Sequence, residues 1–198
     1  MKKFELTTEF ITNAFGKKLF RIKALVEFGN VKAGELGGYV EKEGNISQDG
    51  DAWVCGDAWV SGDAWVSGNA RVSGNARVSG NAWVYGNARV SGNARVRGDA
   101  WVCGDAWVYG NARVSGNAKV YGNADYALVQ GFGTEFRCTT FYRGKNKKIM
   151  VNCGCFHGDL EGFRKQVKET RSGKIAKEYL MIADLMENHF ASEDSGNE

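Results

Sequence analysis

The chain has 198 residues, enough to bury a substantial core, and its net charge of +3 is too small to indicate a general nucleic-acid-binding protein. No apolar run follows Met1-Lys2-Lys3, so we expect neither a signal peptide nor a membrane span. The five cysteines are an odd number without the look of a disulfide framework, which favours reduced thiols and a cytoplasmic protein.

Residues 1–37 are predicted to form an N-terminal β cap. Phe4-Glu5-Leu6 and Leu19–Leu25 have the composition of strands, and Gly16-Lys17-Lys18 between them has that of a turn. A terminal unit of this kind is expected to differ from the units beside it, because the end of a repeat array has only one neighbour.

A six-residue phrase, Gly-(Asn/Asp)-Ala-x-Val-x, begins at Gly50 and has thirteen starts up to Ala124, the last being Gly122-Asn123-Ala124, without an insertion or a deletion. Because side chains alternate faces along a strand, Ala and Val are predicted to point inward and the two x residues outward. Gly with Asn or Asp tolerates a left-handed backbone, so each such pair is predicted to form a corner. A fixed period of this length predicts a solenoid.

The repeat resembles that of hexapeptide-repeat proteins, whose fold is a left-handed parallel β-helix with three hexads in each coil. Residues 72–77, Val-Ser-Gly-Asn-Ala-Arg, fit the pattern of that family. The resemblance implies a mainly β protein with a left-handed β-helix over residues 38–126, and assembly side by side as a homotrimer. In the degenerate lead-in at residues 38–49, Val40 and Ile46 are expected to fall in phase with the alanines.

With three hexads in a coil, residues eighteen positions apart stack on one outward face, about 4.8 Å apart along the axis. Tryptophan and arginine dominate the three resulting columns. The first column is Trp53, Arg71, Arg89 and Trp107; the second is Trp59, Arg77, Arg95 and Arg113, joined by Arg97; the third is Trp65, Trp83, Trp101 and Lys119, with Tyr85 and Tyr121 beside it.

Two interpretations of these columns are compatible with each other. A row of exposed indoles favours a covered surface, so an oligomer interface is predicted at Trp65, Trp83, Trp101, Tyr85 and Tyr121. Stacked arginines repel one another unless anions or carboxylates lie between them, and tryptophan stacks on bases. An anionic ligand site is therefore predicted on these faces or in the grooves between neighbouring subunits, formed by Arg71, Arg77, Arg89, Arg95, Arg97, Arg113, Trp59 and Trp107. Slippage during repeat copying is an alternative origin of the pattern, but it explains less well why the third column stays aromatic for three coils.

The hexapeptide resemblance also implies an acyltransferase as an alternative, because many relatives transfer acyl groups with a histidine as general base. Residues 50–124 contain neither His nor Glu, and a carbonic-anhydrase-like zinc site needs three histidines where this chain has His157 and His189. The aspartates of the repeat, at Asp51, Asp57, Asp63, Asp99 and Asp105, fall at corners, where Asp replaces Asn as a turn residue. We therefore expect no enzymatic activity and no cofactor.

Residues 127–190 are predicted to form a ββαα segment that caps the solenoid or serves oligomerisation. Phe136–Tyr142 and Lys148–Phe156 form a predicted hairpin around Gly144–Lys147. Two helices come next: Leu160, Phe163 and Val167 mark the first, with Asp159 as its N-cap, and Ile175, Tyr179, Ile182 and Met186 mark the second. Residues 191–198 are predicted to be a flexible acidic tail.

Cysteines and a histidine in this region have a weak metal-binding pattern. Cys153, Cys155 and His157 lie two positions apart and are expected on one side of a strand, with Cys138 approaching from its hairpin partner, so the four could hold a tetrahedral zinc. Ile149 and Val151 share that side, which favours core packing, and no metal site is predicted. Cys55 and Cys103 take outward positions usually held by Ser and are expected under a subunit contact.

Two flanking stretches resemble a phage and prophage protein family: Leu19–Leu25 continuing to Leu36–Glu41, and Cys153-Gly154-Cys155-Phe156 leading into Leu160 and Phe163. The resemblance implies a phage-encoded protein, and phage genomes encode small oligomeric proteins that sequester nucleotide immune signals of the host. The resulting hypothesis is a non-catalytic, cytoplasmic, oligomeric anti-defence protein that sequesters a cyclic or ADP-ribose-type nucleotide. The alternatives are a structural or protein–protein interaction module and an acyltransferase; nucleic acid is not an expected partner.

Overall fold

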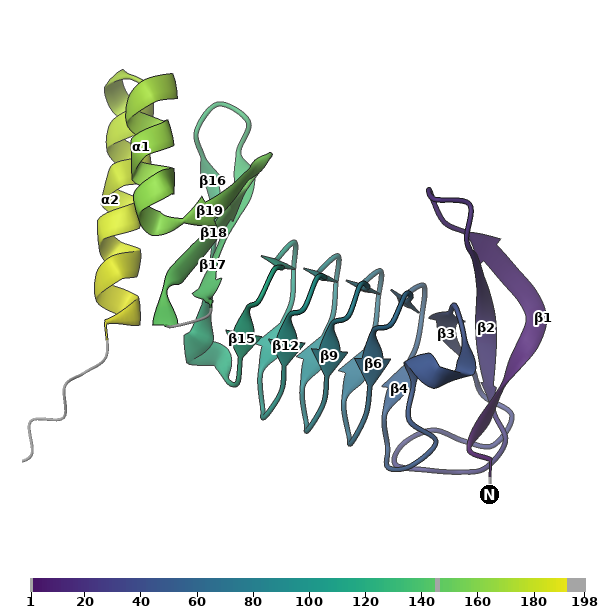
Figure 1. Cartoon of the computed structure of the whole chain (residues 1–198). Helices are drawn as coiled ribbons and strands as arrows, with labels where there is room; N and C mark the ends of the chain where they lie inside the picture. The colour runs from purple at the N-terminus through teal and green to yellow at the C-terminus, as the bar shows by residue number, and fades with distance from the viewer. Residues whose placement is uncertain (1, 145–146, 192–198) are drawn as a thin grey trace, which may run out of the picture. The chain divides into compact units, whose positions relative to one another are not determined.

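The computed structural model describes residues 2–144 and 147–191 and divides the chain into two compact units, Met1–Asn123 and Ala124–Glu198 (Figure 1). The first unit contains a strand-rich cap and a parallel β-solenoid, and the second contains a four-stranded sheet and two helices. Among the described residues, no helix has both the length and the apolar character that crossing a membrane requires.

The solenoid consists of twelve strands of two residues each, one for each of the twelve complete hexads of residues 50–121. Each pairs in parallel with strands eighteen positions away: Arg95 lies opposite both Arg77 and Arg113. This register confirms the predicted coil of three hexads. The strands are β4 (Trp53–Val54), β5 (Trp59–Val60), β6 (Trp65–Val66), β7 (Arg71–Val72), β8 (Arg77–Val78), β9 (Trp83–Val84), β10 (Arg89–Val90), β11 (Arg95–Val96), β12 (Trp101–Val102), β13 (Trp107–Val108), β14 (Arg113–Val114) and β15 (Lys119–Val120).

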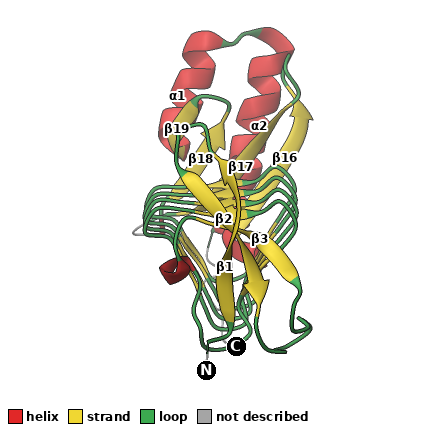
Figure 2. Cartoon of the chain, turned by 90° about the vertical axis from the view of Figure 1, so that its right-hand side faces the viewer, coloured by secondary structure: helices red, strands yellow, loops and turns green. Residues whose placement is uncertain are grey.

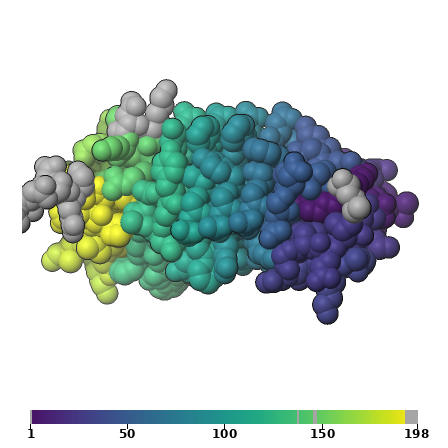
Figure 3. Space-filling model, turned by 90° about the horizontal axis from the view of Figure 1, so that it is seen from below, coloured from purple at the N-terminus to yellow at the C-terminus, as the bar shows by residue number. Residues whose placement is uncertain are grey.

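Three flat faces result from this pairing. We call them the arginine face (β5, β8, β11 and β14), the tryptophan face (β6, β9, β12 and β15) and the mixed face (β4, β7, β10 and β13). Seen from the side of the cap, successive coils superpose, so that equivalent corners lie one behind another (Figure 2). In the space-filling view the coils pack against one another without gaps on the visible face (Figure 3).

The interior of the solenoid is filled by the alanines and valines of the hexads, as predicted. Every one of them from Ala52 to Val120 is at most 1% exposed. A small residue and a β-branched residue alternate around the coil, and the branched side chain suits a pleated strand. The interior of the solenoid is therefore uniform along its length.

Corners are formed by the glycine and the amide or carboxylate residue after it. Gly80 has a φ of +74°, and a Cβ atom added there would lie 2.9 Å from the backbone nitrogen of Gly98 in the next coil. The amide side chains add a ladder along the corner: Asn69 Nδ2 donates to Asn87 Oδ1 at 3.1 Å, and Asn87 Nδ2 donates to Asp105 Oδ1 at 3.0 Å. Glycine is required here both for its left-handed backbone and for the close approach of coils.

The cap extends the arginine face. Strand β1 (Phe4–Thr12) pairs antiparallel with β2 (Lys18–Ala24), which pairs antiparallel with β3 (Leu36–Val40), and β3 pairs in parallel with β5. The result is a seven-stranded sheet in the order β1-β2-β3-β5-β8-β11-β14.

The same cap closes the open end of the solenoid. Trp53, the first member of its column, is only 1% exposed because Phe4 and Phe28 pack against it edge-on, with ring centroids 6.3 and 5.3 Å away. The buried Lys3 donates from Nζ to the carbonyl oxygens of Gly50 and Ala52, both at 3.0 Å. These two carbonyl groups would otherwise face solvent at the end of the repeat array, and Lys3 provides their hydrogen-bond donor.

The lead-in coil has a different register from the one expected. Val40 lies opposite Val60 and Ile46 opposite Val66, so both are in phase with the valines and not with the alanines. The expectation was wrong because Ile46 and Val54 are eight positions apart, two more than a hexad, and these extra residues shift the register.

The second unit is built on an antiparallel sheet in the order β16-β17-β18-β19. The expected hairpin is formed by β17 (Arg137–Arg143) and β18 (Ile149–Cys153), and its turn includes residues 145–146, which lie outside the described residues. Two further strands, β16 (Tyr126–Phe132) and β19 (Phe156–Asp159), flank the hairpin.

Helices α1 (Leu160–Thr170) and α2 (Gly173–Phe190) complete the unit, as predicted. The side chain of Asp159 accepts a hydrogen bond from the backbone nitrogen of Gly162 at 2.9 Å, which makes it the N-cap of α1. The predicted apolar positions form the core with residues of the sheet: Leu160, Phe163, Val167, Tyr179, Ile182 and Met186 are buried together with Phe141 and Val151. Of the predicted tail, residues 192–198 lie outside the described residues.

Candidate functional site: an arginine groove

The outward residues form the three predicted columns. On the arginine face, Trp59, Arg77, Arg95 and Arg113 lie opposite one another in successive strands; on the mixed face the column is Trp53, Arg71, Arg89 and Trp107; and on the tryptophan face it is Trp65, Trp83, Trp101 and Lys119. Tryptophans and arginines therefore lie in straight rows along the axis of the solenoid.

A groove of about 500 Å³ lies between the arginine face and the turn that joins β1 to β2. The turn is held in shape by Asn13, whose Oδ1 accepts hydrogen bonds from the backbone nitrogens of Phe15 at 2.9 Å and Lys17 at 3.1 Å. One wall of the groove is the segment Ile11–Phe15. The other is formed by Trp59, Arg77, Ser79, Arg95 and Arg97.

The arginine wall carries positive charge that nearby carboxylates do not balance. Among the described residues, no carboxylate lies within ion-pair distance of Arg77, Arg95 or Arg97. Burial, together with the like charges of Arg77, Arg113 and Arg97, lowers the pKa of Arg95 below its usual value. The guanidinium of Arg77 lies 5.5 Å from the ring centroid of Trp59, which is a cation–π contact.

Of the eight predicted ligand-binding residues, the groove brings four together: Trp59, Arg77, Arg95 and Arg97. Arg113 lies next to Arg95 on the same face but does not line the groove. The remaining three, Arg71, Arg89 and Trp107, are on the mixed face. There Trp107 donates from Nε1 to Ser91 Oγ at 3.0 Å, and its ring packs against Tyr109 at 5.4 Å.

The Ile11–Phe15 wall was not predicted. Phe15 at its tip is 87% exposed, and Ile11 is 36% exposed. The only sequence signal was the turn at residues 16–18, which places a hairpin in the cap but does not say which face of the solenoid the hairpin meets. The pairing of β3 with β5 determines that the hairpin lies on the arginine face.

On the tryptophan face four of the five predicted aromatic residues form one continuous ladder. Trp65 and Trp83 meet edge-on at 5.6 Å, Trp83 and Trp101 stack at 5.5 Å with their planes 8° apart, and Tyr85 meets Trp101 edge-on at 6.5 Å. Trp65 and Trp83 remain 38% and 41% exposed, and Tyr121 is 51% exposed. A hydrogen bond with Cys103 and partial burial raise the pKa of Tyr85 to about 12. That this ladder is an oligomer interface stays a prediction.

The residues weighed for zinc do not converge. Cys153 packs toward the helices, whereas His157 lies opposite Asn152 and its Nε2 is 3.1 Å from Tyr142 Oη. The expectation that Cys153, Cys155 and His157 share one side of a strand was wrong, because β18 ends at Cys153 and a turn at Gly154 separates it from β19. Among the described residues, His, Cys, Asp and Glu side chains form no group of three or more with metal-site geometry, Cys138 included.

The two cysteines of the repeat differ in exposure. Cys103 is 3% exposed, and Cys55 is partly buried, which raises the pKa of its thiol. A raised pKa reduces the thiolate fraction, and the thiolate is the nucleophilic form of cysteine. His189 is exposed at the end of α2 and packs against Phe190 at 4.9 Å.

Comparison with known protein families supports the solenoid and adds no chemistry. A family model described as the YdcK β-solenoid repeat matches residues 70–86, 88–104 and 106–122. The three matches begin eighteen positions apart, which is the length of one coil. A comparison with curated proteins found no match.

Proposed function

We propose that this β-solenoid protein is a non-catalytic binding protein that sequesters an anionic, base-containing small molecule in the arginine groove. The observation that carries the proposal is the meeting of Arg77, Arg95 and Arg97, without a carboxylate partner among the described residues, beside the ring of Trp59. Clustered guanidinium groups repel one another, and a bound anion relieves that repulsion.

A nucleotide has the matching chemistry. Guanidinium groups bind phosphate oxygens through paired N–H donors, and Trp59 and Phe15 are aromatic surfaces on which a base stacks. The groove volume of about 500 Å³ lies within the range of small-molecule sites. Phe15, at 87% exposure, has the solvent access needed to close over a ligand.

The composition of the groove supports binding without turnover. Its lining residues are Ile, Thr, Asn, Ala, Phe, Trp, Ser and three Arg, and none of them is a His, Asp, Glu, Lys, Cys or Tyr, the usual general bases. A general base needs a group that exchanges protons near the working pH. The acyltransferase alternative would need such a group from elsewhere.

The family resemblance of the flanking segments extends the proposal. It adds that the protein is phage-encoded and acts in the host cytoplasm, and that the ligand is a cyclic or ADP-ribose-type nucleotide of host immune signalling. The resemblance of the repeat to hexapeptide proteins adds assembly of three subunits, for which the exposed ladder of Trp65, Trp83 and Trp101 is the proposed contact.

The test is titration calorimetry of the full chain with a panel of cyclic dinucleotides and ADP-ribose, comparing wild type with Arg95→Met. We expect Arg95→Met to weaken binding at least about tenfold, which is the loss of one charge-assisted contact. Arg89→Met, an outward arginine of the mixed face, is the matched control and should leave binding unchanged. Chromatography should recover the ligand intact.

Two results would overturn the proposal. If no member of the panel binds, the surface is better explained as a protein–protein module. If Arg89→Met weakens binding as much as Arg95→Met does, the groove is not the site.

A further inference from the structure

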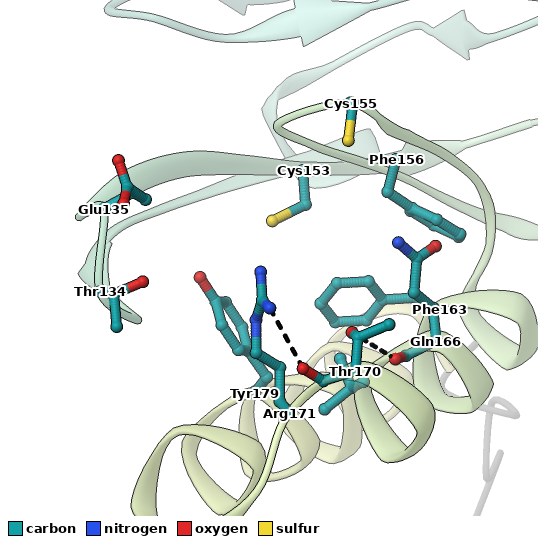
Figure 4. Close-up of a pocket in the computed structure, with 11 residues that line it drawn as sticks. Thr134, Glu135, Cys153, Cys155, Phe156, Phe163, Gln166, Thr170, Arg171 and Tyr179 are labelled. Carbon is teal, nitrogen blue, oxygen red and sulfur yellow. Dashed lines mark hydrogen bonds between the residues drawn. The ribbon is translucent and has the colours of Figure 1, made fainter.

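The second unit contains a cavity of its own, of about 330 Å³, between the sheet and the two helices (Figure 4). Its residues come from the turn after β16, the end of β18 and the turn that follows it, the start of β19, α1 and the residue after it, and the first half of α2. None of them belongs to the arginine groove, so the two hollows are separate sites.

One side of this cavity is aromatic. Phe163 lies at its centre and meets Phe156 at 5.6 Å and Tyr179 edge-on at 5.9 Å. Tyr179 is fixed in place because its Oη donates to the carbonyl oxygen of Phe132 at 3.2 Å. A further aromatic ring could contact these three rings either face to face with an offset or edge to face, which are the geometries that aromatic pairs prefer.

The cavity is also lined by a guanidinium. Arg171 comes directly after the last residue of α1, and its Nη1 donates only to the backbone oxygen of Thr170, at 3.2 Å, among the described residues. Figure 4 shows its side chain extending from the helices toward Cys153. Arg164, on the same helix, is by contrast paired with three carboxylates, those of Glu161, Asp184 and Glu187.

The size and charge of the cavity limit the kind of ligand that it can bind. A volume of about 330 Å³ is near the lower limit of small-molecule sites and accommodates a single ring with a short substituent. One guanidinium matches one carboxylate, and the neighbouring Glu135 on the rim disfavours anions of higher charge, such as phosphates. Gln166 and Thr134 add neutral hydrogen-bonding groups at the rim.

We propose that this cavity binds a small aromatic carboxylic acid. The ring occupies the space beside Phe156, Phe163 and Tyr179, and the carboxylate accepts paired hydrogen bonds from Arg171. Cys153, half-buried in the same wall with its Sγ accepting from Thr139 Oγ1 at 3.1 Å, is covered by the bound ring.

The experiment uses phenylacetate as the probe and phenylacetamide, its neutral counterpart, as the matched compound, with the full-length protein. Saturation-transfer NMR should detect phenylacetate, and Arg171→Met should weaken its binding at least about tenfold. Lys168→Met removes an exposed charge from the same helix outside the cavity and should leave binding unchanged. Arg95→Met should also leave it unchanged, which separates this site from the groove.

A second readout does not depend on Arg171. Phenylacetate should slow alkylation of Cys153 by iodoacetamide at least threefold, as measured by mass spectrometry, while Cys55 in the solenoid reacts at an unchanged rate. The proposal is overturned if phenylacetamide binds as tightly as phenylacetate, if Arg171→Met binds normally, or if Cys153 is not protected at about 10 mM probe, beyond the millimolar range of weak specific binding.

Discussion

The solenoid and the C-terminal unit bury their cores in different ways. In the solenoid, each hexad contributes one alanine and one valine to the interior, and the outward residues pack only outside it. In the C-terminal unit, large aromatic residues such as Phe163 and Tyr179 are at once the core and the wall of the cavity. A solenoid face can therefore carry unbalanced charge with little effect on the fold, whereas a change in the C-terminal cavity alters packing as well.

The surroundings of Arg95 in the solenoid and of Arg164 in the C-terminal unit differ in the same way. Arg95 is surrounded by like charges and lies on a scaffold that does not depend on it. Arg164 lies among three carboxylates and links α1 to α2. Replacing Arg164 should therefore lower the free energy of unfolding, whereas replacing Arg95 should raise it.

The largest effect is expected at a corner of the solenoid. Gly80→Ala adds a Cβ to a residue with a φ of +74° and places it 2.9 Å from the Gly98 nitrogen, so backbone strain and a clash between coils add together. We expect the free energy of unfolding to fall by about 3 kcal/mol, measured by urea denaturation monitored by circular dichroism. Gly16→Ala is the control: its φ is +76° but nothing lies within 4 Å, so about 1 kcal/mol should be lost. Equal losses would show that coils do not meet closely at this corner.

The cap contributes a buried charge whose effect depends on pH. Burial lowers the pKa of Lys3 from its usual 10.5 to about 8, against the attraction of Asp51 and Asp49. Between pH 8 and 10.5 the unfolded chain binds a proton at Lys3 that the folded protein does not, so stability from this group rises with pH.

The measurement is the difference in unfolding free energy between wild type and Lys3→Met across this pH range. Because other titrating groups cancel in the difference, the stability of wild type relative to Lys3→Met should increase by about 2 to 3 kcal/mol from pH 8 to 10.5 and stay constant below pH 7. A flat difference would mean that the Lys3 amine keeps its usual affinity for protons.

Arg164→Gln should destabilise the C-terminal unit. The change leaves Glu161, Asp184 and Glu187 close together without their shared cation, and the side chain of Arg164 is only 15% exposed. Since the carboxylates themselves are exposed, we expect a loss of about 1 kcal/mol, seen as a lower thermal midpoint. Lys165→Gln, whose 4.0 Å contact with Glu169 is exposed, should change little. A higher midpoint for Arg164→Gln would contradict the clamp between α1 and α2.

Arg95→Gln should have the opposite and smallest effect. Removing one of four neighbouring guanidinium groups relieves repulsion, so the free solenoid should gain about 0.5 kcal/mol at low salt. The gain should disappear in about 1 M salt, where charges are screened beyond roughly 3 Å. If Arg95→Gln is less stable than wild type at low salt, a partner already balances the arginine face.

Much of the solenoid was predictable because its contacts are local and repeated. The positions of Ala52 and Val54 in one hexad determine the side-chain directions of all the others, and the period of eighteen aligns Trp83 with Trp101. The prediction failed where the period breaks: at Ile46, where two extra residues shift the register, and at Cys155, where a turn divides an expected strand.

The candidate site was predicted in part for the same reason. Trp59, Arg77, Arg95 and Arg97 could be placed from the period, but a column of arginines is only one wall of a groove. The other wall, Ile11–Phe15, comes from a hairpin that lies more than forty positions earlier in the chain and has no repeat to reveal its place.

The sequence by itself determined the coil, its core and the residues on each face. The direction of each side chain follows from its position in the hexad, and every hexad repeats the same positions. Only the tertiary structure decided that a hairpin turn faces the arginines and that three rings and Arg171 enclose a cavity. These contacts join segments that share no repeat period. Their interaction energies depend on many long-range contacts, which a local sequence pattern does not reveal.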